Sequence, residues 1–197
     1  MMWRWIIRFS RVVLLLSLPA GVQAADKPPI RFSFSGQGLT VHAMPRTPDQ
    51  MTAFYAGRGF PANMLTPISH VCFLTVSMRH TRRDAVWLEP SRWRIVDAEG
   101  HSVQRLNRDF WNRVWETMQA PPASRATFGW SQLPESRDLQ PEEPVGGNIT
   151  IVQPRGPFTL EMSFATGQDK KGPDIVARIT DLVCHGQSGD ETKGAGP

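Results

Sequence analysis

Short segments of alternating apolar and polar residues, separated by proline and glycine, most constrain what this chain can fold into. The clearest segment spans residues 71–78, where Cys72, Leu74, Val76 and Met78 share one face because successive side chains of a strand point to opposite sides. Further segments of this kind lie at 30–34, 39–42, 85–89, 92–97, 101–106, 126–133, 147–152, 158–164 and 175–183. Short strands with frequent turn signals predict an all-β protein, an antiparallel β-sandwich.

Two short helical insertions interrupt the strand pattern. Thr47 is followed by Pro48 and, three residues on, by Gln50, which is a capping box with proline at the first helical position. We expect this helix to run through Ala56. A second helix is predicted over 108–118, where tryptophan, valine and methionine recur at helical spacing on one face.

A turn rich in proline and acid lies at residues 139–147, with the sequence Leu-Gln-Pro-Glu-Glu-Pro-Val-Gly-Gly, and an alternating strand follows it. This stretch resembles the corresponding turn of many bacterial immunoglobulin-like domains. The resemblance covers about 15 residues and implies an immunoglobulin-like sandwich. It implies no function, because one fold carries many functions.

The first 24 residues have the pattern of a signal peptide. Arg4, Arg8 and Arg11 precede a short apolar run at 12–18, and Val-Gln-Ala at 22–24 offers small residues for cleavage. A membrane-spanning helix needs roughly 20 apolar residues, so we expect release rather than membrane insertion. The sequence predicts one sandwich domain over 25–186, a disordered tail over 187–197, and a periplasmic or secreted location.

The chain has two cysteines, Cys72 and Cys184, each in an apolar stretch that is predicted to be a strand. An exported protein meets an oxidising compartment, where such a pair forms a disulfide. The alternative is a redox or metal-binding pair of thiols. The absence of a C-x-x-C motif favours the disulfide.

The charge of the exported chain is nearly balanced. The full sequence has 22 Lys and Arg against 18 Asp and Glu, and loss of three signal-peptide arginines leaves 19 against 18. Nucleic-acid binding needs a concentrated positive surface. The only local candidate, the arginines between 79 and 94, is interleaved with acids. We therefore expect no nucleic-acid partner.

Histidine and methionine lie two residues apart at two places, His42 with Met44 and Met78 with His80. Residues two apart on a strand share a face, so each pair could present an imidazole and a thioether to one ion. These ligands suit Cu(I). A Cu(I)-binding carrier is therefore one hypothesis. The other interpretation places Met78 in the core and His80 in a turn.

Tryptophan and arginine gather on the second predicted helix, where Trp111 and Trp115 lie one turn apart and Arg108 and Arg113 lie alongside. These residue types are enriched at binding hot spots. One hypothesis is a surface that binds another envelope protein; exposed indoles could also stack on a glycan. The alternative is that the indoles are buried and close one end of the sandwich.

The sequence contains no G-x-S-x-G, no H-E-x-x-H and no glycine-rich phosphate loop. It therefore predicts a protein that is not an enzyme and needs no cofactor. The function we expect is an exported binding or assembly-accessory module. The Cu(I) carrier and an envelope glycan-binding module are the alternatives.

Overall fold

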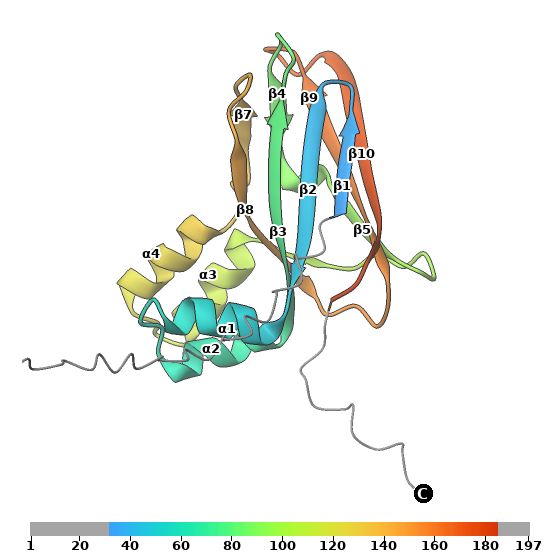
Figure 1. Cartoon of the computed structure of the whole chain (residues 1–197). Helices are drawn as coiled ribbons and strands as arrows, with labels where there is room; N and C mark the ends of the chain where they lie inside the picture. The colour runs from blue at the N-terminus through green and yellow to red at the C-terminus, as the bar shows by residue number, and fades with distance from the viewer. Residues whose placement is uncertain (1–31, 185–197) are drawn as a thin grey trace, which may run out of the picture.

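The structure, a computed structural model, describes residues 32–184. The predicted signal peptide, the first residues of the predicted domain and the predicted tail lie outside this range. Two antiparallel sheets pack face to face (Figure 1). Sheet A has the strand order β1 (Phe32–Gly36), β2 (Leu39–Arg46), β3 (Val71–His80), β8 (Val145–Val152) and β6 (Arg105–Leu106). Sheet B has the order β10 (Gly172–Leu182), β9 (Phe158–Thr166), β4 (Val86–Leu88) and β7 (Arg137–Leu139), and β5 (Arg94–Asp97) also pairs with β9.

The core of the sandwich lies between the inner faces of the two sheets. Leu74, Val76 and Met78 of β3 form one buried cluster with Leu160 and Met162 of β9. The predicted inward face of the segment 71–78 is therefore confirmed, and so is the antiparallel β-sandwich.

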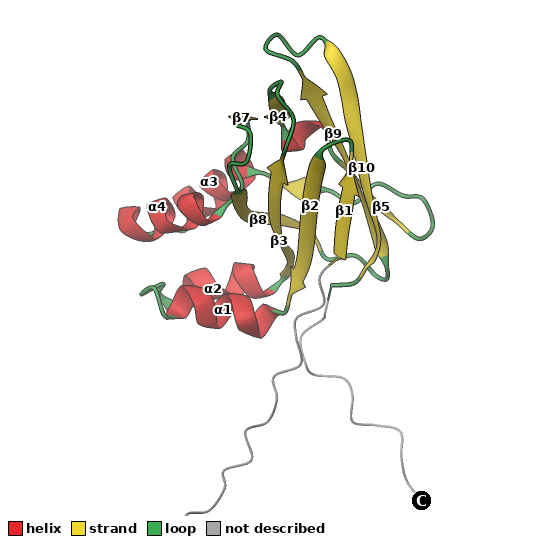
Figure 2. Ribbon diagram, turned by 45° about the horizontal axis from the view of Figure 1, so that its top comes forward, coloured by secondary structure: helices red, strands yellow, loops and turns green. Residues whose placement is uncertain are grey.

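Four helices form two pairs beside sheet A (Figure 2). One pair, α1 (Pro48–Ala56) and α2 (Ala62–Ser69), connects β2 to β3; the other, α3 (Arg108–Thr117) and α4 (Pro122–Ser131), connects β6 to β7. Phe73 points to the side of β3 opposite Leu74 and joins a second buried cluster with residues of both pairs. The helices therefore cover the outer face of sheet A near the start of β3.

The two helical insertions are confirmed, but each contains a second helix. The predicted strand at 126–133 is wrong, because these residues lie mostly in α4. Pro122 occupies the first turn of that helix, where its missing N–H costs nothing, so the prolines start a helix as well as ending the previous one. Helix α2 contains Pro67, which disguised its helical pattern.

The predicted strand at 101–106 is also only partly correct. Val96 and Ser102 form an isolated bridge, and Val103 N donates to Ile95 O, so the turn exists. The strand itself, β6, pairs with β8 in the other sheet. The segment after the turn therefore crosses from sheet B to sheet A.

The disulfide is confirmed between Cys72 at the start of β3 and Cys184 after β10, with a Cα–Cα distance of 5.7 Å and a sequence separation of 112. It ties sheet A to the last described residue of the chain. A bond of this kind indicates an oxidising compartment outside the cytoplasm. Within residues 32–184, no helix has the length and apolar character needed to cross a membrane.

Candidate functional site: a cleft between the helix pairs

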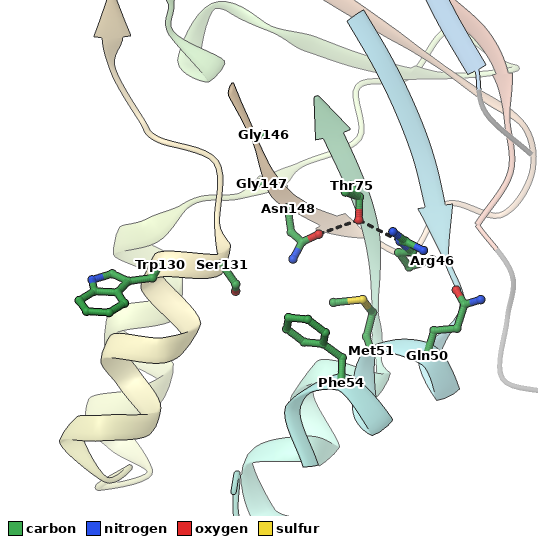
Figure 3. A pocket seen from close by; sticks show the side chains of 10 residues that line it. All are labelled: Arg46, Gln50, Met51, Phe54, Thr75, Trp130, Ser131, Gly146, Gly147 and Asn148. Carbon is green, nitrogen blue, oxygen red and sulfur yellow. Dashed lines mark hydrogen bonds between the residues drawn. The ribbon is translucent and has the colours of Figure 1, made fainter. Parts of the chain in front are cut away.

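A cleft of about 540 Å³ opens between the two helix pairs, with the outer face of sheet A as its floor (Figure 3). Its lining comes from β2, α1, β3, the end of α4 and β8: Arg46, Gln50, Met51, Phe54, Thr75, Trp130, Ser131, Gly146, Gly147 and Asn148. Thr75 and Asn148 are cross-strand partners in the register of β3 and β8, so their side chains stand next to each other on the floor.

The polar groups of the floor form a chain of hydrogen bonds. Nε of Arg46 donates to the hydroxyl of Thr75 over 2.9 Å, and that hydroxyl donates to Oδ1 of Asn148 over 2.8 Å (Figure 3). This chain fixes the plane of the Arg46 guanidinium. No Asp or Glu side chain is among the residues that line the cleft.

Tyr55 links the two helix pairs behind the cleft. Its hydroxyl lies 2.7 Å from Ser131 Oγ, and Gln132 Nε2 donates to it over 3.2 Å. Burial raises the pKa of Tyr55 to about 12, although hydrogen bonds from Ser131, Asn148 and Gln132 oppose that shift. The phenol therefore keeps its proton at neutral pH and holds α1 beside the end of α4.

The walls of the cleft are apolar. Met51 and Phe54 reach into it from α1, and the Arg58 guanidinium lies 3.4 Å from the centre of the Phe54 ring. Trp130, at the end of α4 on the opposite side, projects outward with 90% of its surface exposed. The other described tryptophans are buried or partly buried, so Trp130 differs from all of them.

The predicted partner surface on the second helix is wrong for its indoles. Trp111 and Trp115 are buried and stack on each other, with ring centres 5.0 Å apart. Trp111 Nε1 donates to Thr150 Oγ1 over 2.7 Å. Arg108 and Arg113 are exposed, and Arg108 donates to the carbonyl of Gly129 over 3.2 Å, next to Trp130. The two indoles form the apolar face of α3. Burial of this face removes it from water and holds the helix on the sheet.

The four residues of the Cu(I) hypothesis do not meet at one site. Met78 pairs with Val41 and His80 with Leu39, so both side chains point into the sandwich, where both are buried. His42 and Met44 pair with Ser77 and Thr75 on the outer face. The two pairs therefore lie on opposite sides of sheet A. His80 instead bonds through Nε2 to the Leu139 carbonyl over 2.9 Å.

Arginines of the segment 79–94 are largely neutralised by acids, as the interleaved sequence predicts. Arg79 pairs with Glu142, and Arg82 with Asp84, each over 2.7 Å. Arg92 contacts Asp174. A continuous positive surface for a phosphate backbone is therefore not built from these residues.

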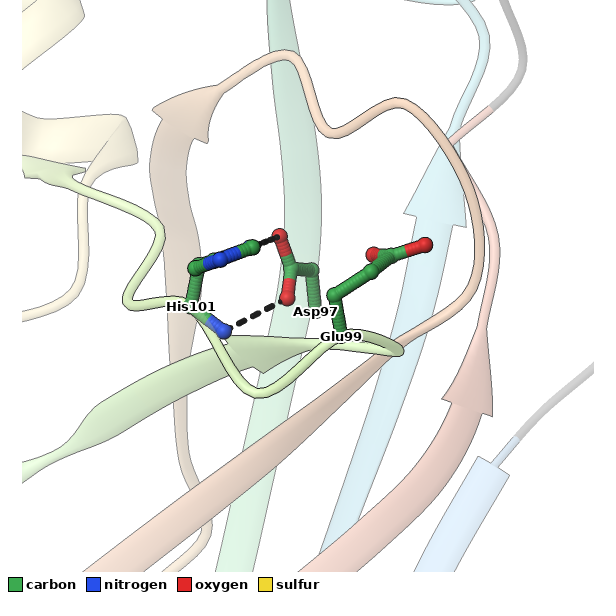
Figure 4. A group of neighbouring side chains, drawn as sticks. All are labelled: Asp97, Glu99 and His101. Atoms are coloured by element: carbon green, nitrogen blue, oxygen red, sulfur yellow. Dashed lines mark hydrogen bonds and ion pairs between the residues drawn. The ribbon is translucent and has the colours of Figure 1, made fainter.

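Asp97, Glu99 and His101 form a second polar group in the turn after β5 (Figure 4). Asp97 Oδ1 accepts from the backbone N–H of His101 over 2.7 Å, and Oδ2 lies 3.3 Å from His101 Nδ1. These two hydrogen bonds close the turn. They explain why Asp97 and His101 lie together, and neither of them involves Glu99.

Sequence reasoning missed the cleft. Its floor residues, Arg46, Thr75 and Asn148, belong to three strands and carry no local motif. The one signal available in the sequence was Trp130. Trp111 and Trp115 lie one helical turn apart and can share a buried face, whereas no second tryptophan lies one turn from Trp130.

The fold and the cleft together define a β-sandwich protein with two helical insertions that form a cleft on one sheet. No protein-family model matches this chain, and no curated protein matches it. Among solved structures, the yjhA protein of Bacillus subtilis is 14% identical with a TM-score of 0.31, over 46% of this chain and 54% of that one. The ycdA protein of Bacillus subtilis strain 168 is 11% identical with a TM-score of 0.34, over 56% of this chain and 29% of that one. This chain thus spans about half of the first and under a third of the second.

Proposed function

We propose that this protein is an exported, non-enzymatic binding module whose binding site is the cleft between α1 and α4. The observation that carries the proposal is the exposure of Trp130 at the mouth of a cleft with apolar walls. Large aromatic side chains supply much contact area at low entropic cost, and they anchor many interfaces.

The chemistry of the cleft supports binding rather than catalysis. Its hydroxyl and amide groups are bonded to one another in a fixed arrangement, and Ser131 Oγ donates to the Phe128 carbonyl over 2.7 Å. A nucleophile with a neighbouring base is the minimum for covalent catalysis. The lining residues contain neither histidine nor a carboxylate to serve as that base.

The partner that fits best is a segment of another envelope protein. The predicted export signal and the disulfide support an extracytoplasmic location. A protein segment brings apolar side chains for Met51 and Phe54 together with polar backbone groups for the floor. A glycan is less well matched to the thioether and phenyl walls.

The test is a selection of random peptides displayed on phage against the oxidised domain without its signal peptide. We expect selected peptides to lose at least about tenfold in affinity, measured by calorimetry, when Trp130 is replaced by alanine. The matched control is Val176→Ala, which removes an exposed apolar side chain on β10 far from the cleft. Peptides that bind both variants as tightly as the parent would show that the cleft is not the site.

A further inference from the structure

We propose that the cleft recognises an acidic side chain of an extended peptide segment, and that the Arg46 guanidinium binds its carboxylate. This inference rests on the proposed function, since it names the chemistry of the ligand that the same cleft takes. It follows from the hydrogen bonds of the floor, from the charge of the lining residues and from the position of the aromatic groups.

The first step concerns the free groups of Arg46. Its Nε is used by Thr75, and no hydrogen bond or ion pair joins its two terminal nitrogens to any group in residues 32–184. A guanidinium held through Nε presents both terminal nitrogens in a fixed plane. This is the fork that binds a carboxylate through two parallel hydrogen bonds.

The second step concerns the amide oxygens of the cleft, each of which already accepts one hydrogen bond. Asn148 Oδ1 accepts from Thr75, and Gln50 Oε1 accepts from the backbone N–H of Thr47 over 3.1 Å. Each of these oxygens already accepts one hydrogen bond, whereas the two terminal nitrogens of Arg46 and Nε2 of Gln50 donate to no group in residues 32–184. A carboxylate only accepts hydrogen bonds, whereas each hydroxyl of a neutral sugar also needs an acceptor. The cleft is matched to an anion.

The third step is charge complementarity. The lining residues include a cation and no anion, and Arg58 adds a second positive charge over the ring of Phe54. Arg58 bonds to the Phe54 carbonyl over 2.8 Å, and no ion pair within the described chain neutralises it. Clefts lined by one sign of charge focus the field and favour a ligand of the opposite sign.

The fourth step distinguishes a side chain from a chain terminus. Arg46 lies at the end of β2 beside the floor, Phe54 faces the floor from α1, and the exposed Trp130 ring points away from the floor residues (Figure 3). A peptide backbone that crosses the mouth can lower a Glu side chain to the guanidinium while its apolar neighbours contact Phe54 and Trp130. A C-terminal carboxylate is attached directly to the backbone and lacks the two methylene groups that let a Glu side chain reach the guanidinium.

The test compares two capped tripeptides, acetyl-Phe-Glu-Phe-amide and acetyl-Phe-Gln-Phe-amide, titrated into the oxidised domain and followed by NMR at low ionic strength. We expect the Glu peptide to bind about tenfold more tightly than the Gln peptide. In Arg46→Gln this preference should fall to about one. In Arg113→Gln, which removes an exposed charge outside the cleft, it should persist.

Arg46→Lys keeps the positive charge but removes the two parallel donors of the guanidinium. We expect this variant to keep only a small part of the preference for the Glu peptide over the Gln peptide. Circular dichroism of each variant checks that the fold is retained, and the Lys variant remains informative if Arg46→Gln is unstable. A preference that survives in folded Arg46→Gln, or no binding of the Glu peptide at millimolar concentration, would overturn the proposal.

Two further probes test the source of the carboxylate. Acetyl-Phe-Gln-Phe with a free C-terminus should bind no better than its amide; Arg46-dependent binding of the free acid would instead assign a chain terminus. Methyl glucuronide should not compete, and its competition would assign an anionic glycan. Loss of binding in Trp130→Ala without any carboxylate preference would overturn this inference and leave the proposed function standing.

Discussion

The hydroxyl of Tyr55 lies at the contact between the two helical insertions, and its protonation bears on the geometry of the cleft. The buried ring stacks on Phe128, with centres 5.4 Å apart, and the hydroxyl bonds to Ser131. Tyr55 of the first insertion is therefore joined to α4 of the second by one apolar contact and one polar contact. Ionisation of this phenol would place a charge in an apolar contact.

Tyr55 is the only tyrosine of the chain, so its titration can be read directly from phenolate absorbance. We expect a midpoint near 12 in the folded protein, because burial disfavours the phenolate, and near 10 in denaturant. The folded state binds the proton more tightly, so the free energy of unfolding should be unaffected below pH 10 and fall as pH rises from about 10 to about 12. A folded-state midpoint near 10 would contradict the burial of this hydroxyl.

Gly147 of β8 is a second residue on which the cleft depends. The chain after α4 crosses it so closely that an added Cβ would lie 2.6 Å from Leu133 N and 2.8 Å from Gln132 C. Leu133 N donates to Asn148 O over 2.8 Å in this crossing. The end of α4, and Trp130 with it, is thus held to the floor by backbone contact.

We expect Gly147→Ala to lower the free energy of unfolding by roughly 1 to 3 kcal/mol, because the backbone of 132–133 must move. Urea denaturation measures the change. Gly156→Ala is the matched control: an added Cβ there meets nothing within 4 Å, so its effect should stay within about 0.5 kcal/mol. Equal stabilities of the two variants would show that the crossing is loose.

At the scale of elements, α3 is held in place by its aromatic face. Trp115 packs against both Trp111 and Phe128, with ring centres 5.0 and 5.1 Å away, and 1% of its surface is exposed. Asn107 caps the helix by accepting from the N–H of Phe110 over 2.9 Å. The helix is therefore a structural support for α4, and the groups that we propose to bind a ligand lie on the elements beside it.

Trp115→Ala should lower the free energy of unfolding by about 3 to 5 kcal/mol, since it leaves a cavity in the cluster under the helices. Trp130→Ala removes the same side chain from an exposed position and should change stability by less than about 0.5 kcal/mol. Thermal denaturation of both variants makes the comparison. Similar losses would mean that Trp130 packs against the fold.

At the scale of the whole molecule, the disulfide closes a loop that contains the second helical insertion, α3 and α4, and most of the strands. The unfolded chain loses much conformational freedom when residues 112 apart are linked. Neither cysteine lines the cleft, so we expect the disulfide to stabilise the sandwich rather than to shape the cleft.

We expect reduction of Cys72–Cys184, or the double substitution of both cysteines by serine, to lower the free energy of unfolding by about 4 to 5 kcal/mol in the chain-entropy account. Urea denaturation with and without dithiothreitol measures this difference. The double variant should not respond to dithiothreitol. An unchanged midpoint on reduction of the parent would show that native contacts alone hold the two sheets.

The sequence by itself determined the sandwich, the inward face of residues 71–78, the capping box of α1 and the disulfide, because each depends on local periodicity or on residue chemistry. It failed for α2 and α4, since their prolines and aromatic residues favour other local structures and only packing on sheet A makes them helical. The pairing of β2 with β3 decided that the histidine–methionine pairs lie on opposite sides of the sheet. The cleft needed the tertiary structure, because Arg46, Thr75, Trp130 and Asn148 are brought together by strand register and by the crossing over Gly147, which no local pattern encodes.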